Sequence, residues 1–166
     1  MFELKRLSRD AIPAALEKAL RYRMLNEPEQ AESICLDVLA AEPDHRDALA
    51  MLILALTDQF PTTPSATQRA RELLPRLPGE YERAYYAGIV AERQGLARFR
   101  TGAPGAGHAA HDWLREAMDW YARAESLRPP GNDDALLRWN SCARLIEANP
   151  DIRPAEAEEF QPALED

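Results

Sequence analysis

Apolar side chains recur every three or four residues along most of the chain, which is the spacing of one face of an α-helix. The first such stripe comprises Ile12, Leu16, Ala19, Leu20 and Met24. Breaks rich in Pro, Gly and Asn separate the stripes and predict helices at about 10–24, 28–41, 47–59, 65–78, 80–96, 112–127 and 133–148. The expected fold class is therefore all-α, with short connections that make successive helices antiparallel neighbours.

One helical pattern occurs twice, with the same offset at every position. A small residue opens it, a mid-sized residue follows four positions later, a small or β-branched residue seven later, and Pro twelve later. The matched pairs are Ala31 with Ala117, Cys35 with Tyr121, Val38 with Ala124, and Pro43 with Pro129. A unit of this kind cannot bury its apolar face alone, so such units stack into a solenoid. The pattern favours a binding scaffold over an enzyme built around a pocket.

This spacing resembles the tetratricopeptide repeat (TPR), a 34-residue pair of antiparallel helices. Counting from Ile12 places Ala19 and Ala31 at the family's small-residue positions, Tyr22 and Cys35 at positions where it often has aromatic residues, and Pro43 at its proline position. Counting from Tyr81 places Gly88 at a small-residue position and Gly95 at the usual turn glycine. The resemblance implies a TPR-like helical-hairpin solenoid over residues 1–148, with about three repeats and a C-terminal capping helix.

The chain departs from the family pattern in three places. The middle unit is degenerate, with Ile53 where a small residue is expected. The paired helices of the third unit are too far apart in sequence, which predicts a Gly-rich inserted loop at 97–111. The last helix carries Trp139 at a position that would prevent close packing of a further helix, so it is expected to act as the cap.

Charge is concentrated after the last predicted helix. Residues 147–166 hold seven acidic residues and only Arg153 as a base, whereas the whole chain has a net charge of −8. We therefore expect a nearly balanced helical domain followed by an acidic C-terminal tail at 149–166. Nucleic-acid binding is disfavoured, because phosphate backbones require clustered cations.

No apolar run approaches the ~20 residues that a membrane span requires. The first ten residues also lack the apolar stretch of a signal peptide. The sequence therefore predicts a cytoplasmic protein without a membrane association.

The TPR resemblance implies a concave groove, lined by the first helix of each pair, that holds a peptide or helical segment of another protein. Arg and aromatic side chains dominate binding hot spots, so Tyr85 and Arg144 are the expected anchors. Helix-on-helix packing is the alternative role for Leu16, Leu20 and Ile89. The candidate groove residues are Leu16, Leu20, Arg23, Asp47, Leu54, Asp58, Tyr85, Ile89, Glu92, Leu136, Asn140 and Arg144.

The predicted insert offers a second candidate surface. Arg98, Phe99 and Arg100 at its base could contact an acidic peptide or the acidic tail, and the alternative is a solvated excursion without a function. His108 and His111 lie three residues apart without a distant third ligand, so no metal site is predicted. We likewise expect no cofactor.

Catalytic chemistry is not indicated. Cys35 and Cys142 lie within helical patterns and are expected to be buried hydrophobic residues rather than a disulfide or a metal pair. No serine lies on the strained turn that a nucleophile requires.

The sequence thus predicts a non-enzymatic protein–protein interaction scaffold, acting as an adaptor, chaperone or assembly factor. One alternative is a structural subunit of a larger complex or a homo-oligomer. A second is a regulator that responds to a metal or another ligand through the 97–111 insert.

Overall fold

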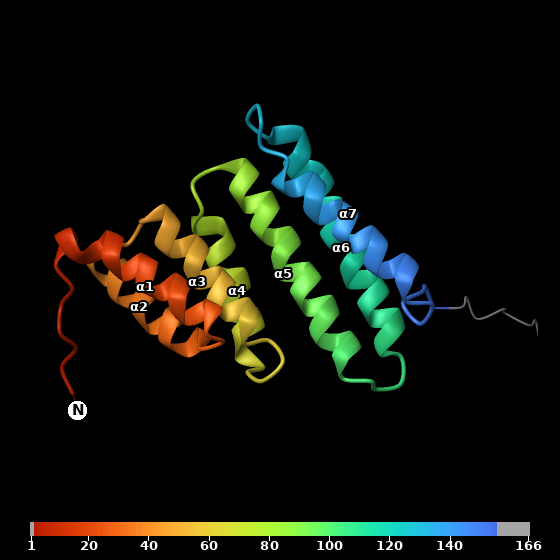
Figure 1. The fold of residues 1–166 in the computed structure, drawn as a ribbon, viewed down its shortest axis with the longest axis horizontal. Helices are drawn as coiled ribbons and strands as arrows, with labels where there is room; N and C mark the ends of the chain where they lie inside the picture. The colour runs from red at the N-terminus through yellow and green to blue at the C-terminus, as the bar shows by residue number, and fades with distance from the viewer. Residues whose placement is uncertain (1, 156–166) are drawn as a thin grey trace, which may run out of the picture.

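The computed structural model describes residues 2–155, and in this range helices are the main regular elements and no strand occurs (Figure 1). The prediction of an all-α fold is confirmed. Most of the predicted acidic tail lies outside the described residues. Within the described part of the chain, no helix has both the length and the apolar character needed to cross a membrane. The helices are α1 (Ile12–Met24), α2 (Pro28–Ala41), α3 (Arg46–Asp58), α4 (Ser65–Leu73), α5 (Glu80–Arg100), α6 (Ala106–Leu127) and α7 (Asp134–Ala148), with 3₁₀ turns η1 (Arg9–Ala11) and η2 (Leu74–Arg76).

The helices form a row in which each packs mainly on its neighbours in sequence (Figure 1). The exceptions involve α3, which contacts both α1 and α5 and so joins the two halves of the molecule. One apolar core lies among α1 to α4, and a second lies among α5 to α7. The cores meet between α3 and α5, because Val90 of α5 belongs to the first core and Leu54 of α3 packs on the second.

Small residues are buried at three positions where the sequence predicted close helix packing. Ala31 and Ala117 are fully buried, and Gly88 is buried within α5. A larger side chain at these positions would push neighbouring helices apart. All three residues are buried, as the sequence prediction of tight helix packing requires.

The predicted inserted loop at 97–111 is wrong. Helix α5 continues to Arg100 and α6 already begins at Ala106, so only residues 101–105 connect them. The prediction failed because Gly95 was assigned to a turn, whereas it lies inside α5. A Cβ atom on Gly95 would lie 3.1 Å from Trp113 Cβ and 3.2 Å from the Ala110 carbonyl oxygen. The glycine therefore allows α6 to pack closely against α5 instead of ending the helix.

Candidate functional site

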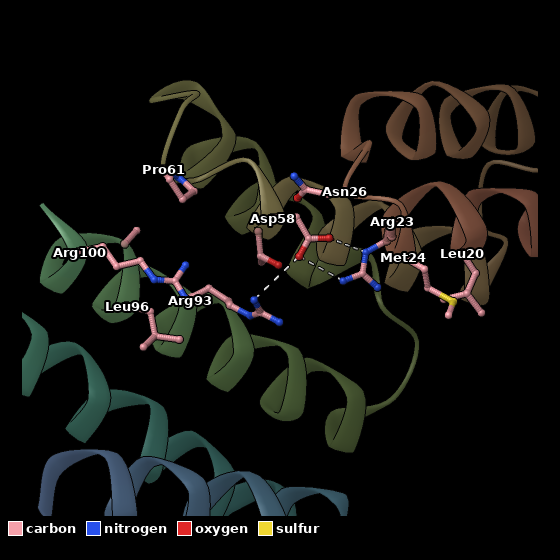
Figure 2. Close-up of a pocket in the computed structure, with 11 residues that line it drawn as sticks. Leu20, Arg23, Met24, Asn26, Asp58, Pro61, Arg93, Leu96 and Arg100 are labelled. Atoms are coloured by element: carbon pink, nitrogen blue, oxygen red, sulfur yellow. Dashed lines mark hydrogen bonds and ion pairs between the residues drawn. The ribbon is translucent and has the colours of Figure 1, made fainter. Parts of the chain in front are cut away.

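A hollow of about 300 Å³ opens where α1, α3 and α5 meet (Figure 2). Three of its polar side chains are arginines, one near the end of α1 and two on α5, and the fourth charge is Asp58 at the end of α3. We call it the arginine hollow. It is lined by Leu20, Arg23, Met24, Asn26, Thr57, Asp58, Pro61, Arg93, Leu96, Ala97 and Arg100.

Helical spacing brings these side chains to one opening. Arg93, Ala97 and Arg100 lie four and three residues apart, so they share one face of α5. On α1, Leu20, Arg23 and Met24 are related in the same way. The hollow therefore depends on the ends of three helices that the two cores hold in place.

Asp58 is held mainly by Arg23. The Arg23 guanidinium donates from Nε to Asp58 Oδ2 at 2.7 Å and from Nη2 to Oδ1 at 3.3 Å. Arg93 Nη1 lies 4.0 Å from Asp58 Oδ1, a longer contact to the same carboxylate (Figure 2). Planar guanidinium and carboxylate groups suit a two-bond pairing of this kind. The Asp58 carboxylate thus contacts two arginines, and the pairing with Arg23 is the stronger one because it consists of two hydrogen bonds.

Arg93 has binding capacity that the described residues do not use. Its Nε–H is buried and has no hydrogen-bond acceptor among them, although the side chain as a whole is 31% exposed. A buried donor without an acceptor costs about 1–3 kcal/mol. Because this nitrogen is closed to solvent, the part of Arg93 that a ligand could reach is the portion that lines the hollow. The three guanidinium groups of Arg23, Arg93 and Arg100 and the carboxylate of Asp58 together give the hollow a net charge of +2.

The rim of the arginine hollow is apolar. Met24 is 79% exposed and Leu20 is 45% exposed. Both lie on α1 beside Arg23, so an acidic group entering the hollow could bring an apolar neighbour into contact with them. The site can therefore bind an anion and an apolar side chain together.

Four of the predicted partner-binding residues come together here: Leu20, Arg23, Asp58 and Arg100. Two others, Asp47 and Tyr85, line a smaller hollow of about 160 Å³ between α3 and α5 near their N-terminal ends. Leu54 is half-buried on the second core, and Leu16 is half-buried on the first.

The remaining predicted groove residues do not line either hollow. Ile89 and Glu92 are 1% and 6% exposed, so both are buried rather than open to a partner. On α7, Leu136 and Asn140 are half-buried and Arg144 is exposed. Helix α5 thus turns Ile89 and Glu92 inward, whereas Arg144 is exposed on α7 and lines neither hollow.

Glu92 instead takes part in a buried polar cluster that joins α5, α6 and α7. Its carboxylate accepts a hydrogen bond from the Tyr121 hydroxyl at 2.5 Å and another from Arg138 Nη1 at 3.0 Å. Burial raises the pKa of the Tyr121 hydroxyl, and the adjacent carboxylate raises it further. The hydroxyl therefore remains a donor, and the cluster holds three helices together.

The predicted insert residues are separated by the end of α5. Arg100 faces the arginine hollow, whereas Phe99 packs on the second core and Arg98 is exposed. His108 Nδ1 lies 2.8 Å from the Arg153 carbonyl oxygen, which ties the start of α6 to the segment after α7. In residues 2–155 no three His, Cys, Asp or Glu side chains gather in a way that could hold a metal ion.

Sequence reasoning missed Arg93, Met24 and Leu96 as residues of the site. A signal for Arg93 was present, because it follows Ile89 by four residues and precedes Arg100 by seven on the helix. Because the sequence predicted that this helix ends near residue 96, Arg93 and Arg100 were not recognised as lying on one face of the same helix. Met24 was recognised only as part of the apolar stripe of α1.

Both cysteines are buried free thiols. Burial raises the pKa of Cys35 to about 12, with Arg23 opposing and Glu32 adding to the shift. Burial and then Glu92 raise the pKa of Cys142 to about 12. Thiolates are the reactive species, so neither residue is suited to nucleophilic chemistry near neutral pH.

We therefore expect neither thiol to react with an aromatic disulfide reagent at pH 8 while the protein is folded, and both to react after guanidinium unfolding. The folded state holds these protons more tightly than the unfolded state, so stability should also fall as the pH rises from about 9 towards 12. Absorbance at 412 nm follows the first effect, and denaturant titrations follow the second. Rapid modification of the native protein would contradict the assignment.

No family model, curated protein or solved structure matches the chain significantly.

Proposed function

We propose that this chain is a non-enzymatic protein–protein interaction scaffold that holds a segment of a partner protein along α1, α3 and α5. In this proposal the helices form a TPR-like solenoid, with α1/α2, α3/α4 and α5/α6 as hairpins and α7 as the cap. The buried small residues Ala31, Gly88 and Ala117 support that arrangement, as does the contact of α3 with both α1 and α5. Such proteins act as adaptors, chaperones or assembly factors.

The observation that carries the proposal is the arginine hollow with its exposed apolar rim. Hot spots in protein interfaces combine Arg and large apolar groups in a partly enclosed setting, and Arg93 and Met24 provide both within one opening. The titratable groups of this hollow are three guanidinium groups and one carboxylate already bound by Arg23. This set suits recognition of an acidic group better than proton transfer.

Exchanging the rim leucine tests the proposal. Peptides are first selected on the wild-type protein from a displayed library of random twelve-residue sequences, and their affinities are measured by fluorescence anisotropy. Leu20→Ser should weaken the selected peptides about tenfold, which corresponds to about 1.4 kcal/mol of lost apolar contact.

Leu127→Ser is the matched control, because Leu127 is 38% exposed at the end of α6 and lies away from the hollow. Its affinities should equal those of the wild type. If every selected peptide binds Leu20→Ser as tightly as the wild type, the α1–α3–α5 surface is not the binding site and the proposed function is wrong.

A further inference from the structure

The arginine hollow and the smaller hollow open along the same two helices. On α3 the smaller hollow is lined by Asp47 and Ala50, and the arginine hollow by Asp58. With Leu54 between them, these residues follow one another at intervals of three or four, so they form one stripe. On α5, Glu82, Tyr86, Arg93, Ala97 and Arg100 follow one another at intervals of four, seven, four and three, so they also share one side of the helix. The two hollows are therefore the two ends of one surface.

The charges at these two ends have opposite signs. The smaller hollow, which we call the acidic hollow, has three carboxylates and one arginine and so a net of two negative charges. Its lining residues are Arg46, Asp47, Ala50, Leu77, Tyr81, Glu82, Tyr85, Tyr86 and Asp134. The arginine hollow has a net of two positive charges. The net charge of this surface therefore changes from −2 at the acidic hollow to +2 at the arginine hollow.

Part of the acidic charge remains available for a ligand. Arg46 pairs with Glu82, whereas Asp47 and Asp134 are exposed and make no ion pair with any described residue. Tyr81 and Tyr85 stack beside them with ring centroids 5.8 Å apart. Aromatic faces next to carboxylates attract a cation by charge and by its interaction with the ring. A Lys or Arg side chain fits this end.

The helix rise sets the separation between the two ends. Asp47 and Asp58 are eleven residues apart on α3, and so are Glu82 and Arg93 on α5, which at 1.5 Å per residue gives about 16 Å. An extended segment covers this distance in about five residues, at roughly 3.3 Å each. Leu54 is half-buried between the hollows, and it offers apolar contact to the intervening residues together with Tyr86, which is half-buried in the lining of the acidic hollow.

We infer that this surface recognises an extended partner segment with an acidic residue and a basic residue about five positions apart, and with apolar residues between them. The acidic side chain pairs with Arg93 and Arg100, and the basic side chain lies against Asp47, Asp134 and the tyrosines. Because like charges repel at both ends, segments with two acids or two bases are excluded. The inference rests on the proposed function and specifies its partner.

Charge reversal at each end tests the inference. The random twelve-residue library is selected in parallel on the wild type, on Arg100→Glu and on Asp47→Lys. Both substituted side chains are exposed, so the fold should tolerate them, and circular dichroism confirms this. Peptides from the wild type should be enriched in acid–base pairs four to six residues apart. Each substitution brings the net charge of its hollow to zero, so peptides from Arg100→Glu should lose the preference for the acidic residue and those from Asp47→Lys the preference for the basic residue.

The matched control is Arg144→Glu, which reverses an exposed arginine on α7 that lines neither hollow. It should select the same peptides as the wild type. A synthetic copy of the most enriched wild-type peptide should bind about tenfold more weakly to Arg100→Glu, and also more weakly in 500 mM than in 50 mM salt.

The outcomes separate the two proposals. If the selected peptides depend on Leu20 but show no charge pattern, or keep the same pattern on both charge-reversed proteins, the partner chemistry inferred here is wrong and the scaffold function stands. If no selected peptide depends on Leu20, the scaffold function itself fails.

Discussion

Gly88→Val is expected to lower the free energy of unfolding by about 3–4 kcal/mol, at the upper end of what overpacking a core costs. A Cβ atom at this position would lie 2.5 Å from Tyr121 Cε1 and 2.7 Å from Cδ1. The ring cannot move aside freely, because its hydroxyl is bound to the buried carboxylate of Glu92. The added side chain would therefore force α5 and α6 apart.

Thermal unfolding checks this prediction. For a chain of this length each kcal/mol shifts the melting temperature by about 2–4 °C, so a decrease of roughly 10 °C is expected. Ala122→Val introduces the same side chain at an exposed position of α6 next to Tyr121, and it should cost less than 1 kcal/mol. Equal effects of the two substitutions would show that Gly88 is not needed for close packing.

The same contact matters for the proposed binding surface. Gly88 lies on the α6-facing side of α5, and Arg93 and Arg100 lie on its open side. A helix is rigid over this length. The packing of α5 on α6 therefore fixes the positions of Arg93 and Arg100 relative to Asp58 on α3. A variant that weakens the α5–α6 contact should therefore also reduce peptide affinity.

Helical periodicity and the positions of small residues predicted much of this fold. The stripes require helices, and Ala31, Gly88 and Ala117 are buried as their spacing indicated. These properties are local or depend on neighbouring helices, so a single sequence contains the information. The TPR-like arrangement as a whole remains part of the proposal.

Gly95 illustrates why the connection between α5 and α6 was misjudged. Glycine lowers helix propensity by about 1 kcal/mol, and that cost favours a helix end when only the local sequence is considered. The close approach of Trp113 and the Ala110 carbonyl compensates for it. Because those residues lie on the next helix, the compensation is a tertiary effect that local patterns do not contain.

The candidate site was only partly predictable for a related reason. Arg93 is open to the hollow, while Glu92, its neighbour in sequence, is buried against α6 and α7. Consecutive residues differ by about 100° around a helix, so the boundary between the packed and the open side of α5 falls between these two. Locating that boundary requires the direction from which α6 and α7 approach.

The burial of Glu92 leads to the second large effect. Arg138→Met should destabilise the protein by about 3 kcal/mol, because removing one partner of a buried ion pair leaves an uncompensated charge. Glu92 is 6% exposed and would retain only the Tyr121 hydroxyl as a donor. Urea titrations of both proteins measure the difference. The matched control is Arg123→Met on the exposed side of α6, where the arginine lies over the Trp120 ring at 5.7 Å, and a loss below 1 kcal/mol is expected.

Replacing both partners separates lost pairing from lost packing. In Glu92→Leu/Arg138→Met no buried charge remains, and apolar replacements of buried ion pairs are often close to neutral. The Tyr121 hydroxyl then loses its acceptor, which costs about 1–3 kcal/mol, so Tyr121→Phe is added to remove that group as well. The triple variant should be more stable than Arg138→Met alone, although it carries three substitutions. If it is less stable, the cluster contributes mainly through packing, and the uncompensated charge of Glu92 is not the cause of the loss in the single variant.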